Sequence, residues 1–538
     1  LYICFIDLRK AFDNVWRDGL WYKMLKQGIG GNFLRVLHDM YLKCKVSIKL
    51  DEGVTSCFNT NTGVKQGCVI SPTLFNMFLN DVVDIFDTSV SEPVTLHDKD
   101  LNCIMYADDL AIISRSPQGM QYCLDKFTQY CNSWMLNVNV TKTKIMICNK
   151  SGRLNDKSDF EINGEKLTSV KEMKYLGIVF SNNGSFKMAT RDLADKARRA
   201  LFKLYKSFGN YTPSIKTLLH LFDATVQPIL LYGSEIWGAS AIDMKKILQI
   251  ETGKTGLYYK NDFEKVHIQC CKNILGVNRK CSNLAVSAEI GRHPQLIQIA
   301  INMLKYWIRI RSLDENGLVY KSFEENKKLV NNEQSCWLMS IRDIFSSLNI
   351  CNNGNETVLD PENIQISHKD FVELCKLCLE RRFDEQLKLD LFDDRDTRKG
   401  NKLRTLRQFK NSIKQEKYLS HIPNINLRKN ITKLRLSAHN LPIETGRYKR
   451  PEKTPPNLRF CEDCNMNLVG DEFHIIMKCD KYKDLRVDFI ETISNLEENV
   501  CNLDSQEKFI FIMRLDNEVV IDSFSLFTKN IIAMRGNF

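Results

Sequence analysis

Aspartates at the ends of short apolar runs limit what this chain can fold into more than any other feature of its sequence. Leu1–Leu8 is an apolar run that carries Asp7 near its end, which is the pattern of a buried strand. Within residues 102–114, two further apolar runs flank Asp108 and Asp109, which is the pattern of a tight hairpin. Taken alone, each aspartate is more often a simple turn residue. If the strands lie side by side, however, three carboxylates come together.

Three carboxylates at one point repel one another unless a cation lies among them. Hard oxygen ligands of this kind suit Mg²⁺. A pair of metal ions held by carboxylates is a recurring solution for in-line phosphoryl transfer, in which one ion activates the attacking oxygen and the other steadies the leaving phosphate. The aspartates therefore predict a phosphoryl-transfer site, provided that the tertiary structure joins them.

The first 180 residues alternate between strand and helix patterns. Helices are predicted at 13–27, 32–43, 72–86 and 118–135, and strands at 1–8, 46–50, 54–60, 102–106, 110–114 and 144–148. This order favours an α+β fold with an antiparallel sheet, ferredoxin-like in outline. From Ser185 to Arg311 the pattern is helical throughout. Residues 312–365 are polar and rich in Asn and predict a linker or irregular segment, Phe371–Leu391 predicts a helix, and the C-terminal tail predicts one or two more.

At 538 residues the chain predicts three or four domains rather than one. It has no apolar run of the ~18–20 residues that a membrane span needs, and its first 30 residues lack the layout of a signal peptide. The 19 Cys are scattered without the framework of a small disulfide-rich domain, so they predict reduced thiols and an intracellular compartment.

The positive charge is concentrated in one segment. The chain carries a net charge of +11, from 76 basic and 65 acidic residues. Between Arg398 and Arg450, 15 Lys and Arg occur with only two acids, Glu416 and Glu444, which gives +13 and leaves −2 for the rest of the chain. Such a block predicts a polyanionic partner, most simply nucleic acid. The alternative is a basic surface that only contacts solvent.

A second cluster of chemical interest lies after the basic block. Cys461, Cys464, His474 and Cys479 are four metal-ligand side chains within 19 residues. A Cys pair two residues apart, followed by His and Cys, is a ligand set for a tetrahedral structural zinc ion. The pairs Cys270-Cys271 and Cys375/Cys378 lack partner ligands at such spacing.

Five segments of the chain, taken together, resemble one enzyme family. They are Phe5–Asp13 (FIDLRKAFD), Gly63–Pro72 (GVKQGCVISP), Tyr106–Asp109 (YADD), Lys142–Lys144 (KTK) and Tyr175–Gly177 (YLG). In this order and spacing they are similar to the palm of a reverse transcriptase from non-LTR (LINE-type) retrotransposons. The resemblance covers about residues 1–180, and a weaker similarity continues toward the C-terminus. It implies a right-hand polymerase palm followed by a helical thumb and a C-terminal helical and zinc-knuckle region.

The resemblance implies catalytic roles for the acidic residues. Asp7 and Asp108 would be the magnesium ligands, and Asp109 would complete the catalytic trio. Phe12 would be the bulky residue that excludes a ribose 2′-OH. Asp13 is predicted to cap the helix that follows it.

The resemblance also implies binding roles for residues beyond the acidic trio. Gln66 and Gly67 would lie beside the nascent base pair, where Gly lets the backbone approach closely. Lys142 would lie near the triphosphate, with Lys144 as a possible substitute. Tyr175, Leu176 and Gly177 would form the primer grip.

The Cys/His segment resembles the zinc knuckle of many LINE-type proteins, which contacts single-stranded nucleic acid. The resulting domain prediction is a palm at 1–182, a helical thumb and connection at 183–311, a linker and helix at 312–396, a basic nucleic-acid-binding segment at 397–450, a zinc knuckle at 451–490 and a helical tail at 491–538.

The function implied is RNA-directed DNA synthesis: copying of the element RNA from a target-DNA 3′-OH, with dNTPs, two Mg²⁺ ions and one structural Zn²⁺. Template RNA and primer or target DNA would be the partners, and nucleus and cytoplasm the compartments. Because the chain begins with Leu and at the Asp7 strand, we expect a piece of a longer protein or a truncated relic without fingers. The alternatives are an inactive relic that only binds nucleic acid, and a maturase or telomerase-like enzyme that shares the palm.

Overall fold

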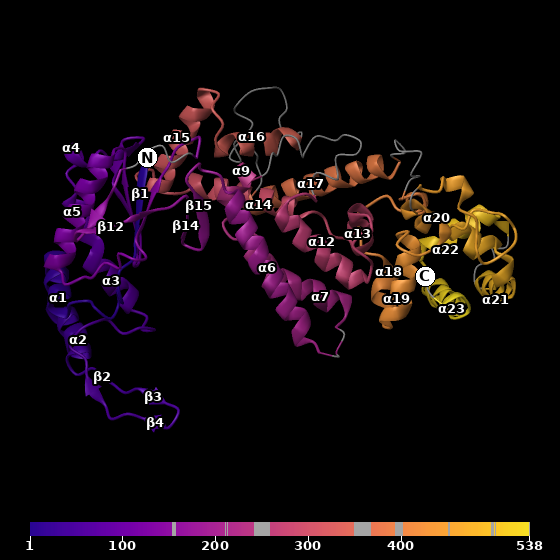
Figure 1. The fold of residues 1–538 in the computed structure, drawn as a ribbon, viewed down its shortest axis with the longest axis horizontal. Helices are drawn as coiled ribbons and strands as arrows, with labels where there is room; N and C mark the ends of the chain where they lie inside the picture. The colour runs from indigo at the N-terminus through magenta and orange to yellow at the C-terminus, as the bar shows by residue number, and fades with distance from the viewer. Residues whose placement is uncertain are drawn as a thin grey trace. The chain divides into compact units, whose positions relative to one another are not determined.

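The computed structural model separates into two compact units (Figure 1), one of residues 1–189 and 313–332 and the other of residues 190–312 and 333–538. The residues that it describes are 1–152, 158–209, 211, 213–241, 259–348, 367–392, 402–449, 452–495, 500 and 502–536. Among these residues no helix is both long enough and apolar enough to cross a bilayer.

The first unit is built on a five-stranded sheet with β1 (Tyr2–Ile6) at its centre, in the order β13-β10-β1-β9-β8. The other strands are β8 (Cys103–Tyr106), β9 (Asp109–Ser114), β10 (Lys144–Ile147) and β13 (Thr168–Ser169). All pairs are antiparallel except that of β10 with the edge strand β13. The sheet and its flanking helices confirm a mixed α and β fold, and only β13 departs from the antiparallel prediction.

Helices cover one face of this sheet. Successive side chains of a strand point to opposite faces, so every second residue of β1, β9 and β10 points toward these helices. Cys4 and Ile6 of β1 point into the main core, together with Leu110 and Ile112 of β9 and Ile145 of β10. The helices of the unit are α1 (Arg17–Lys26), α2 (Gly31–Leu42), α3 (Ser71–Leu79), α4 (Thr88–Ser91) and α5 (Pro117–Ser133). Of these, α5 packs directly on β1 and β9, and α1 packs on α3.

A hairpin covers the other face of the sheet. Phe5 and Met146 belong to a smaller core there, against which Tyr175 and Phe180 of the hairpin pack. The hairpin consists of β14 (Glu172–Tyr175) and β15 (Ile178–Ser181). Because β1 has apolar contacts on both faces, its backbone is held on both sides as well as by its two neighbouring strands.

Short two-stranded pieces complete the first unit. They are β2 (Lys45–Val46) with β5 (Phe58–Asn59), β3 (Lys49–Leu50) with β4 (Gly53–Val54), β6 (Val94–Leu96) with β7 (Lys99–Leu101), and β11 (Glu161–Ile162) with β12 (Glu165–Lys166). The pieces β2 to β5 form an arm that extends beyond α2 (Figure 1). Their positions agree with the strands predicted at 46–50 and 54–60.

The helix predicted at 72–86 is divided in the structure. It is α-helical only to Leu79, and Asn80–Ile85 is a 3₁₀ helix. The Phe78 carbonyl oxygen accepts hydrogen bonds from the Lys23 ammonium at 2.8 Å and from the Tyr130 hydroxyl at 3.2 Å. These two donors take the place that the helix ladder would otherwise fill, which fits the change to 3₁₀ geometry after Phe78.

The second unit is helical. Its first helix, α6 (Lys187–Ser207), begins in the last residues of the first unit's segment 1–189. The elements that follow, up to α17, are α7 (Ile215–Leu221), a π-helical turn (Phe222–Val226), α8 (Gln227–Leu230), α9 (Ser234–Ala241), α12 (Asp262–Leu275), α13 (Asn283–Ile290), α14 (Gln295–Arg311), α16 (Trp337–Ser347) and α17 (His368–Leu391). Helix α14 packs against α9, α12, α16 and α17. A Cβ on Gly238 of α9 would lie 2.7 Å from Ile299 of α14, so the close approach of these two helices requires glycine.

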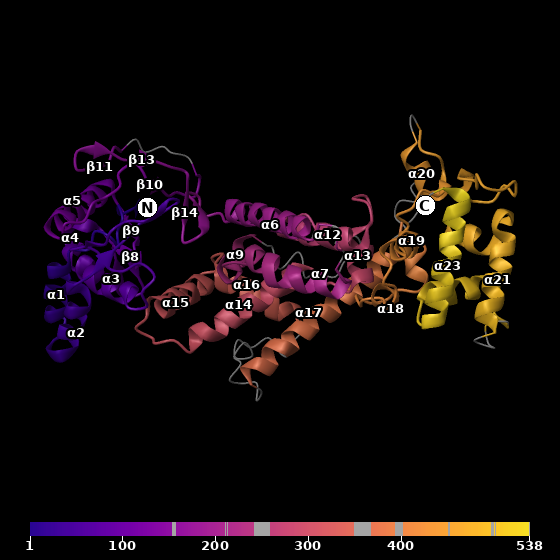
Figure 2. The ribbon, with the colours of Figure 1, turned by 90° about the horizontal axis from the view of Figure 1, so that it is seen from below.

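The C-terminal helices form a group of their own within the second unit (Figure 2). They are α18 (Lys417–His421), α19 (Ile425–Arg435), α20 (Pro442–Thr445), α21 (Lys483–Ser494), α22 (Ser505–Arg514) and α23 (Glu518–Arg535). Figure 2 shows α23 between α19 and α21, and α23 packs on both. The tail thus has three helices where one or two were predicted.

The prediction of a linker or irregular segment at 312–365 was wrong for residues 318–347. This part contains α15 (Leu318–Asn331) and α16. Lys321 of α15 forms an ion pair with Asp98, which helps to join residues 313–332 to the first unit. Two residues 223 positions apart make this contact, so local sequence patterns could not reveal it. The Asn-rich stretch 351–355 lies outside the described residues.

A buried lysine gives a testable prediction for the fold. The Lys23 ammonium lies 3.7 Å from the centre of the Trp134 ring and 2.7 Å from Asp81 Oδ1, and its side chain is 3% exposed. Lys23→Met keeps the methylenes but removes these charge-assisted bonds. Because Asp81 is 41% exposed and stays hydrated, we expect a loss of only about 1–3 kcal/mol in the free energy of unfolding.

Urea unfolding followed by tryptophan fluorescence measures this loss. Lys26→Met, three residues along the same helix at an exposed position, is the control and should change stability by less than about 0.5 kcal/mol. Equal stability of the Lys23 variant and the control would show that the bonds of the Lys23 ammonium do not stabilise the fold.

Candidate active site and metal cluster

The register of the central strands places Asp7 beside Asp109. The last paired residues of β1 and β9 are Ile6 and Leu110, and the strands are antiparallel. One step beyond this pair, the chain continues to Asp7 on one strand and starts from Asp109 on the other. Burial, Asp108 and Asp7, in that order, raise the pKa of the Asp109 carboxyl above its usual range. The three predicted carboxylates are therefore close enough to repel one another.

A strained turn presents Asp108. Tyr106 pairs with Asp109, so the loop between β8 and β9 is the two-residue stretch of Ala107 and Asp108. Ala107 has a φ of 54°, in the left-handed region that a residue with a Cβ rarely adopts. Such a conformation costs about 1–3 kcal/mol and persists only where the surrounding structure imposes it. Here the paired strands on both sides hold the turn.

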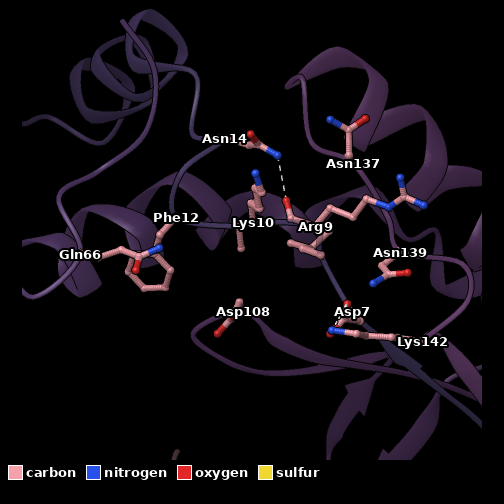
Figure 3. A pocket seen from close by; sticks show the side chains of 12 residues that line it. Asp7, Arg9, Lys10, Phe12, Asn14, Gln66, Asp108, Asn137, Asn139 and Lys142 are labelled. Atoms are coloured by element: carbon pink, nitrogen blue, oxygen red, sulfur yellow. Dashed lines mark hydrogen bonds and ion pairs between the residues drawn. The ribbon is translucent and has the colours of Figure 1, made fainter. Parts of the chain in front are cut away.

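Asp7 and Asp108 line a cavity of about 820 Å³ in the first unit. Figure 3 shows Asp7 with Lys142 at one side, Phe12 with Gln66 at the other, and Asp108 facing the open middle. The full lining is Asp7, Leu8, Arg9, Lys10, Ala11, Phe12, Asn14, Gln66, Asp108, Asn137, Asn139 and Lys142. Its volume is that of a site for a nucleotide-sized ligand. Of the trio, Asp109 is outside this lining.

Phe12 and Gln66 form one wall of the cavity. The Phe12 ring stacks on the Phe75 ring of α3, with centroids 4.7 Å apart and an interplanar angle of 13°. This stack holds the Phe12 side chain in its position at the cavity wall. Gln66 donates from Nε2 to Asp13 Oδ1 at 2.9 Å. The prediction that Asp13 caps the next helix was wrong, because α1 starts after Trp16 and has no side-chain cap. Gly67 has a φ of 82° and is outside the lining.

Arg17 holds the loop that carries Gln66. Its guanidinium donates to the carbonyl oxygens of Gly63 at 2.9 Å, Thr62 at 2.9 Å and Thr60 at 2.5 Å. A further bond goes to the Tyr41 carbonyl at 3.1 Å, and the Tyr41 ring lies 5.3 Å from the guanidinium carbon. All these acceptors are neutral, so Arg17 acts as a clamp on the backbone rather than as an ion-pair partner. The sequence held no signal for this role.

A loop after α5 positions Lys142. The backbone N–H of Asn139 donates to the Asp7 carbonyl at 2.7 Å, and the backbone N–H of Asp7 donates to the Thr143 hydroxyl at 3.2 Å. These bonds fix residues 139–143 against the end of β1. The Lys142 ammonium then lies 3.9 Å from Asp7 Oδ2. Lys144, the predicted substitute, lies on β10 opposite Phe5 and is outside the cavity lining.

Tyr175 contacts the backbone of Asp109 from the face of the sheet that the β14–β15 hairpin covers. Its hydroxyl donates to the Asp109 carbonyl at 3.0 Å, and its ring centre lies 5.3 Å from that of Phe5. Leu176 and Gly177 form the hairpin turn with φ values of 48° and 83°. The predicted primer-grip segment is therefore fixed to the strand that carries Asp109.

Sequence reasoning missed five polar side chains of the cavity, one of which is Asn14, whose Nδ2 donates to the Arg9 carbonyl at 2.8 Å. Arg9 and Lys10 come two and three residues after Asp7, and a basic pair just beyond the end of the candidate strand was the signal that could have found them. Asn137 and Asn139 come from the loop after α5 and carried no such signal. The cavity thus adds two cations beside the carboxylates.

The four predicted metal ligands of the C-terminal segment come together. The donor atoms of Cys461, Cys464, His474 and Cys479 all lie within 4.8 Å of one another. His474 Nε2 is 3.3 Å from Cys464 Sγ. Burial, with a smaller effect of Arg486, lowers the pKa of His474, which favours the neutral imidazole that binds metals. Three thiols and a neutral imidazole fit a tetrahedral metal site.

Polar contacts around Asp463 brace this cluster. Arg535 of α23 lies 2.9 Å from Asp463 Oδ2, and Lys481 lies 3.5 Å from Oδ1. Arg486 of α21 donates to the Cys479 carbonyl at 3.0 Å. The loop between Cys461 and Cys464 is thus joined to the C-terminal helices.

Part of the basic block is internal. Arg435 is fully buried and lies 2.6 Å from Glu289 and 2.7 Å from Glu416. Arg404 lies 2.6 Å from Glu444 and 2.7 Å from Glu472. These two arginines are therefore unavailable to phosphates, and the prediction of a nucleic-acid-binding segment can apply only to other residues of the block. Arg398, Lys399 and Arg450 lie outside the described residues.

Comparison with known proteins agrees with this site. Residues 1–180 match the family model of the reverse transcriptase (RNA-dependent DNA polymerase). The chain is 26% identical over 246 residues to the RNA-directed DNA polymerase from mobile element jockey of Drosophila funebris, a match that covers 44% of this chain and 26% of that protein. The jockey protein of Drosophila melanogaster is 26% identical over 260 residues, covering 46% and 27%. The probable RNA-directed DNA polymerase from transposon BS of the same species is 27% identical over 248 residues, covering 44% and 26%.

A solved structure of telomerase from Candida albicans in complex with a fragment of telomeric RNA aligns with a TM-score of 0.29 and 12% identity, over 52% of this chain and 48% of that one. This likeness is too low to bear on the fold.

Residues 1–180 thus match a reverse transcriptase domain, and they contain the largely antiparallel sheet with its clustered aspartates. The relatives that match are RNA-directed DNA polymerases of mobile elements. The chain spans about a quarter of the length of these relatives.

Carboxylate repulsion gives a prediction that needs no substrate. The raised pKa of Asp109 means that its ionisation favours the unfolded chain, so the wild type loses stability as the pH rises from the usual value of 3.8 through the raised pKa. Asp109→Asn removes this penalty. We expect its melting temperature to exceed that of the wild type by about 1 °C at pH 7.

The difference should shrink as the pH is lowered through the raised pKa toward the usual value of 3.8, because the wild-type carboxyl then becomes protonated. Calorimetry between pH 4 and pH 8 measures it. A variant that is less stable than the wild type at pH 7 would show that Asp109 contributes favourable contacts instead of repulsion.

Proposed function

We propose that this chain carries the catalytic core of an RNA-directed DNA polymerase that copies element RNA by extending a target-DNA 3′-OH. The observation that supports this most is that Asp7, which follows β1, lies beside Asp108 and Asp109 of the β8–β9 hairpin at one end of the central strands. The relatives named above are polymerases of mobile elements, and the matched segment includes all three aspartates.

Asp7 and Asp108 would hold two Mg²⁺ ions. The fit rests on their oxygen donors and on their closeness to Asp109, whose pKa is raised by burial and then by the charges of Asp108 and Asp7, since crowded carboxylates are stabilised by a cation. Bound there, Mg²⁺ supplies the Lewis acidity that phosphoryl transfer requires. Asp109 adds a negative charge beside the other two carboxylates. Its pairing with Tyr106 holds the turn that carries Asp108.

The remaining cavity residues orient the nucleotide. Phe12 excludes a 2′-OH by steric overlap, and its stack on Phe75 prevents it from moving aside. Gln66 lies beside the new base pair, on the loop that Arg17 clamps, and Gly67 lets that loop approach closely. Lys142 compensates negative charge on the triphosphate, and Tyr175, Leu176 and Gly177 hold the primer end.

The partners that we propose follow from this chemistry. They are template RNA, primer or target DNA and dNTPs. Copying of element RNA at genomic DNA places the protein in the cytoplasm and the nucleus of its host.

The polymerase proposal is tested by dNTP incorporation on an RNA template with a DNA primer and Mg²⁺. We expect Asp108→Asn to lower the rate at least ~100-fold, because a metal ligand contributes several kcal/mol to stabilising the transition state. Asp39→Asn, an exposed carboxylate on α2, is the matched control and should retain the wild-type rate.

Two results would count against the proposal. If the Asp108→Asn variant still incorporates dNTPs at the wild-type rate, Asp108 is not a ligand of a catalytic Mg²⁺ ion. A wild-type protein that is folded and binds RNA but incorporates no dNTP would leave only the binding role for this chain.

We also propose that Cys461, Cys464, His474 and Cys479 hold one structural Zn²⁺. Purified protein should contain about one zinc per chain by elemental analysis. Cys464→Ser should lose it and lower the melting temperature by at least ~5 °C, because a structural zinc ion contributes strongly to local folding.

Cys378→Ser on α17 is the control, since that thiol belongs to no cluster among the described residues. It should keep its zinc and its melting temperature. Full zinc content in Cys464→Ser would contradict the proposed ligand set.

A further inference from the structure

A second, smaller hollow lies in the second unit, outside the proposed active site. It has a volume of about 140 Å³. One wall is the turn after α12, with Asn278 and Lys280, and the other is the segment around α20, with Asn440 and Tyr448; Lys402 lies between them. This volume is below the ~300 Å³ of typical small-molecule sites, so it suits one group of a larger ligand.

The acids at the base of this hollow are already neutralised. Glu444 lies 2.6 Å from Arg404 and 2.9 Å from Arg447. Glu472, behind it, lies 2.7 Å from both Arg404 and His439. These carboxylates therefore leave little negative charge to balance the lysines at the rim.

The lysines at the rim are crowded. The Lys402 ammonium donates to the Lys280 carbonyl at 2.5 Å and forms no ion pair with a carboxylate among the described residues. Lys272, on the last turn of α12, is buried behind the rim and does not line the hollow; it donates to the Arg279 carbonyl at 2.9 Å. Burial lowers the pKa of Lys272, and the nearby Lys402 lowers it further. Crowded cations of this kind are stabilised by an anion.

An aromatic ring lies directly beside these cations. The Lys280 ammonium is 4.4 Å from the centre of the Tyr448 ring, and Tyr448 is 50% exposed. Asn440 is exposed at the same mouth and offers both a donor and an acceptor. Cations for a phosphate, with an exposed ring at one side, form the combination that binds single-stranded nucleic acid.

The hollow is attached to the Cys/His cluster. The Ile443 amide in α20 donates to the Gly470 carbonyl at 3.2 Å. A Cβ on Gly470 would lie 2.9 Å from Cys461 Cα, so the two backbones touch. The wall that carries Tyr448 is therefore held by the same segment that holds the metal ligands.

We propose that this hollow binds one phosphate of a single-stranded nucleic acid through Lys280 and Lys402, with the adjacent base stacked on Tyr448. The inference rests on the proposed function, because copying supplies such strands as element RNA and as target DNA. The shared chemistry is a phosphodiester next to an unpaired base.

Binding of a labelled single-stranded 20-mer to the full chain tests the lysines. The protein carries Asp108→Asn, so the measurement does not depend on polymerase activity. We expect the double variant Lys280→Ala and Lys402→Ala to bind about 10-fold more weakly at 0.1 M salt. The slope of log affinity against log salt should fall by about 0.7 for each lost phosphate contact.

Lys529→Ala, an exposed lysine on α23, is the control for net charge and should bind as the parent does. An unchanged affinity and salt slope in the double variant, with its melting temperature unchanged, would overturn the proposal. An equal loss in Lys529→Ala would do the same, because the effect would then be one of total charge.

Tyr448 provides an independent readout. Tyr448→Ala should weaken binding about 5-fold or more with no change in salt slope, and Tyr448→Phe should bind as the parent does, because stacking needs only the ring. Equal binding of the Ala variant would remove the stacking role.

RNA and DNA probes of the same sequence distinguish the sources of the strand. Tighter binding of RNA would assign the hollow to the template, and tighter binding of DNA to the target strand. Loss of binding in these variants, in a protein that incorporates no dNTP, would leave this proposal intact and overturn only the polymerase.

Discussion

The pairing of β1 with a strand on each side is the interaction on which the first unit depends. Its backbone is bonded to β9 and β10, and its side chains alternate between the two cores that cover the sheet. This arrangement favours one register for Ile6 and Leu110, because a shift by one residue would move the side chains of one core into the other. The position of Asp7 beside Asp109 follows from that register. Repulsion between the carboxylates is thus imposed by the hydrophobic sheet and is retained because the sheet is stable enough to hold it.

The basic residues of the second unit serve two different purposes. Arg404 and Arg435 are buried and paired with glutamates from distant segments, so they join parts of the fold. Removing one partner of such a pair would leave an uncompensated buried charge, which is strongly destabilising. Lys280 and Lys402 instead lie at an opening where the acids are already neutralised. Net charge alone does not separate these purposes, since it is the partner of each side chain that decides whether the charge remains available to a ligand.

Much of the first unit could be predicted from its apolar periodicity. The strand at 1–8, the hairpin around Asp108 and the helix at 118–135 appear within a few residues of their predicted bounds. Errors arose where a distant side chain acts on the backbone. Lys23 and Tyr130 bond to the Phe78 carbonyl where the predicted helix becomes 3₁₀. The helix predicted from residue 13 starts only after Trp16, so Asp13 is free to accept from Gln66. Lys321 joins α15 to Asp98. The Cys/His cluster was predictable because all four ligands lie within 19 residues.

The sequence by itself determined the chemical groups of this protein: a strand that ends on Asp7, a turn with Asp108 and Asp109, the order of the polymerase segments and the four metal ligands. These are local patterns, and the period of a strand or the spacing of ligands expresses them directly. Only the tertiary structure decided that Lys142 rather than Lys144 faces Asp7, that Arg17 clamps the Gln66 loop, and which lysines remain at a surface opening. Such outcomes depend on pairings between residues far apart in the chain, and packing selects those pairings only when the whole fold forms.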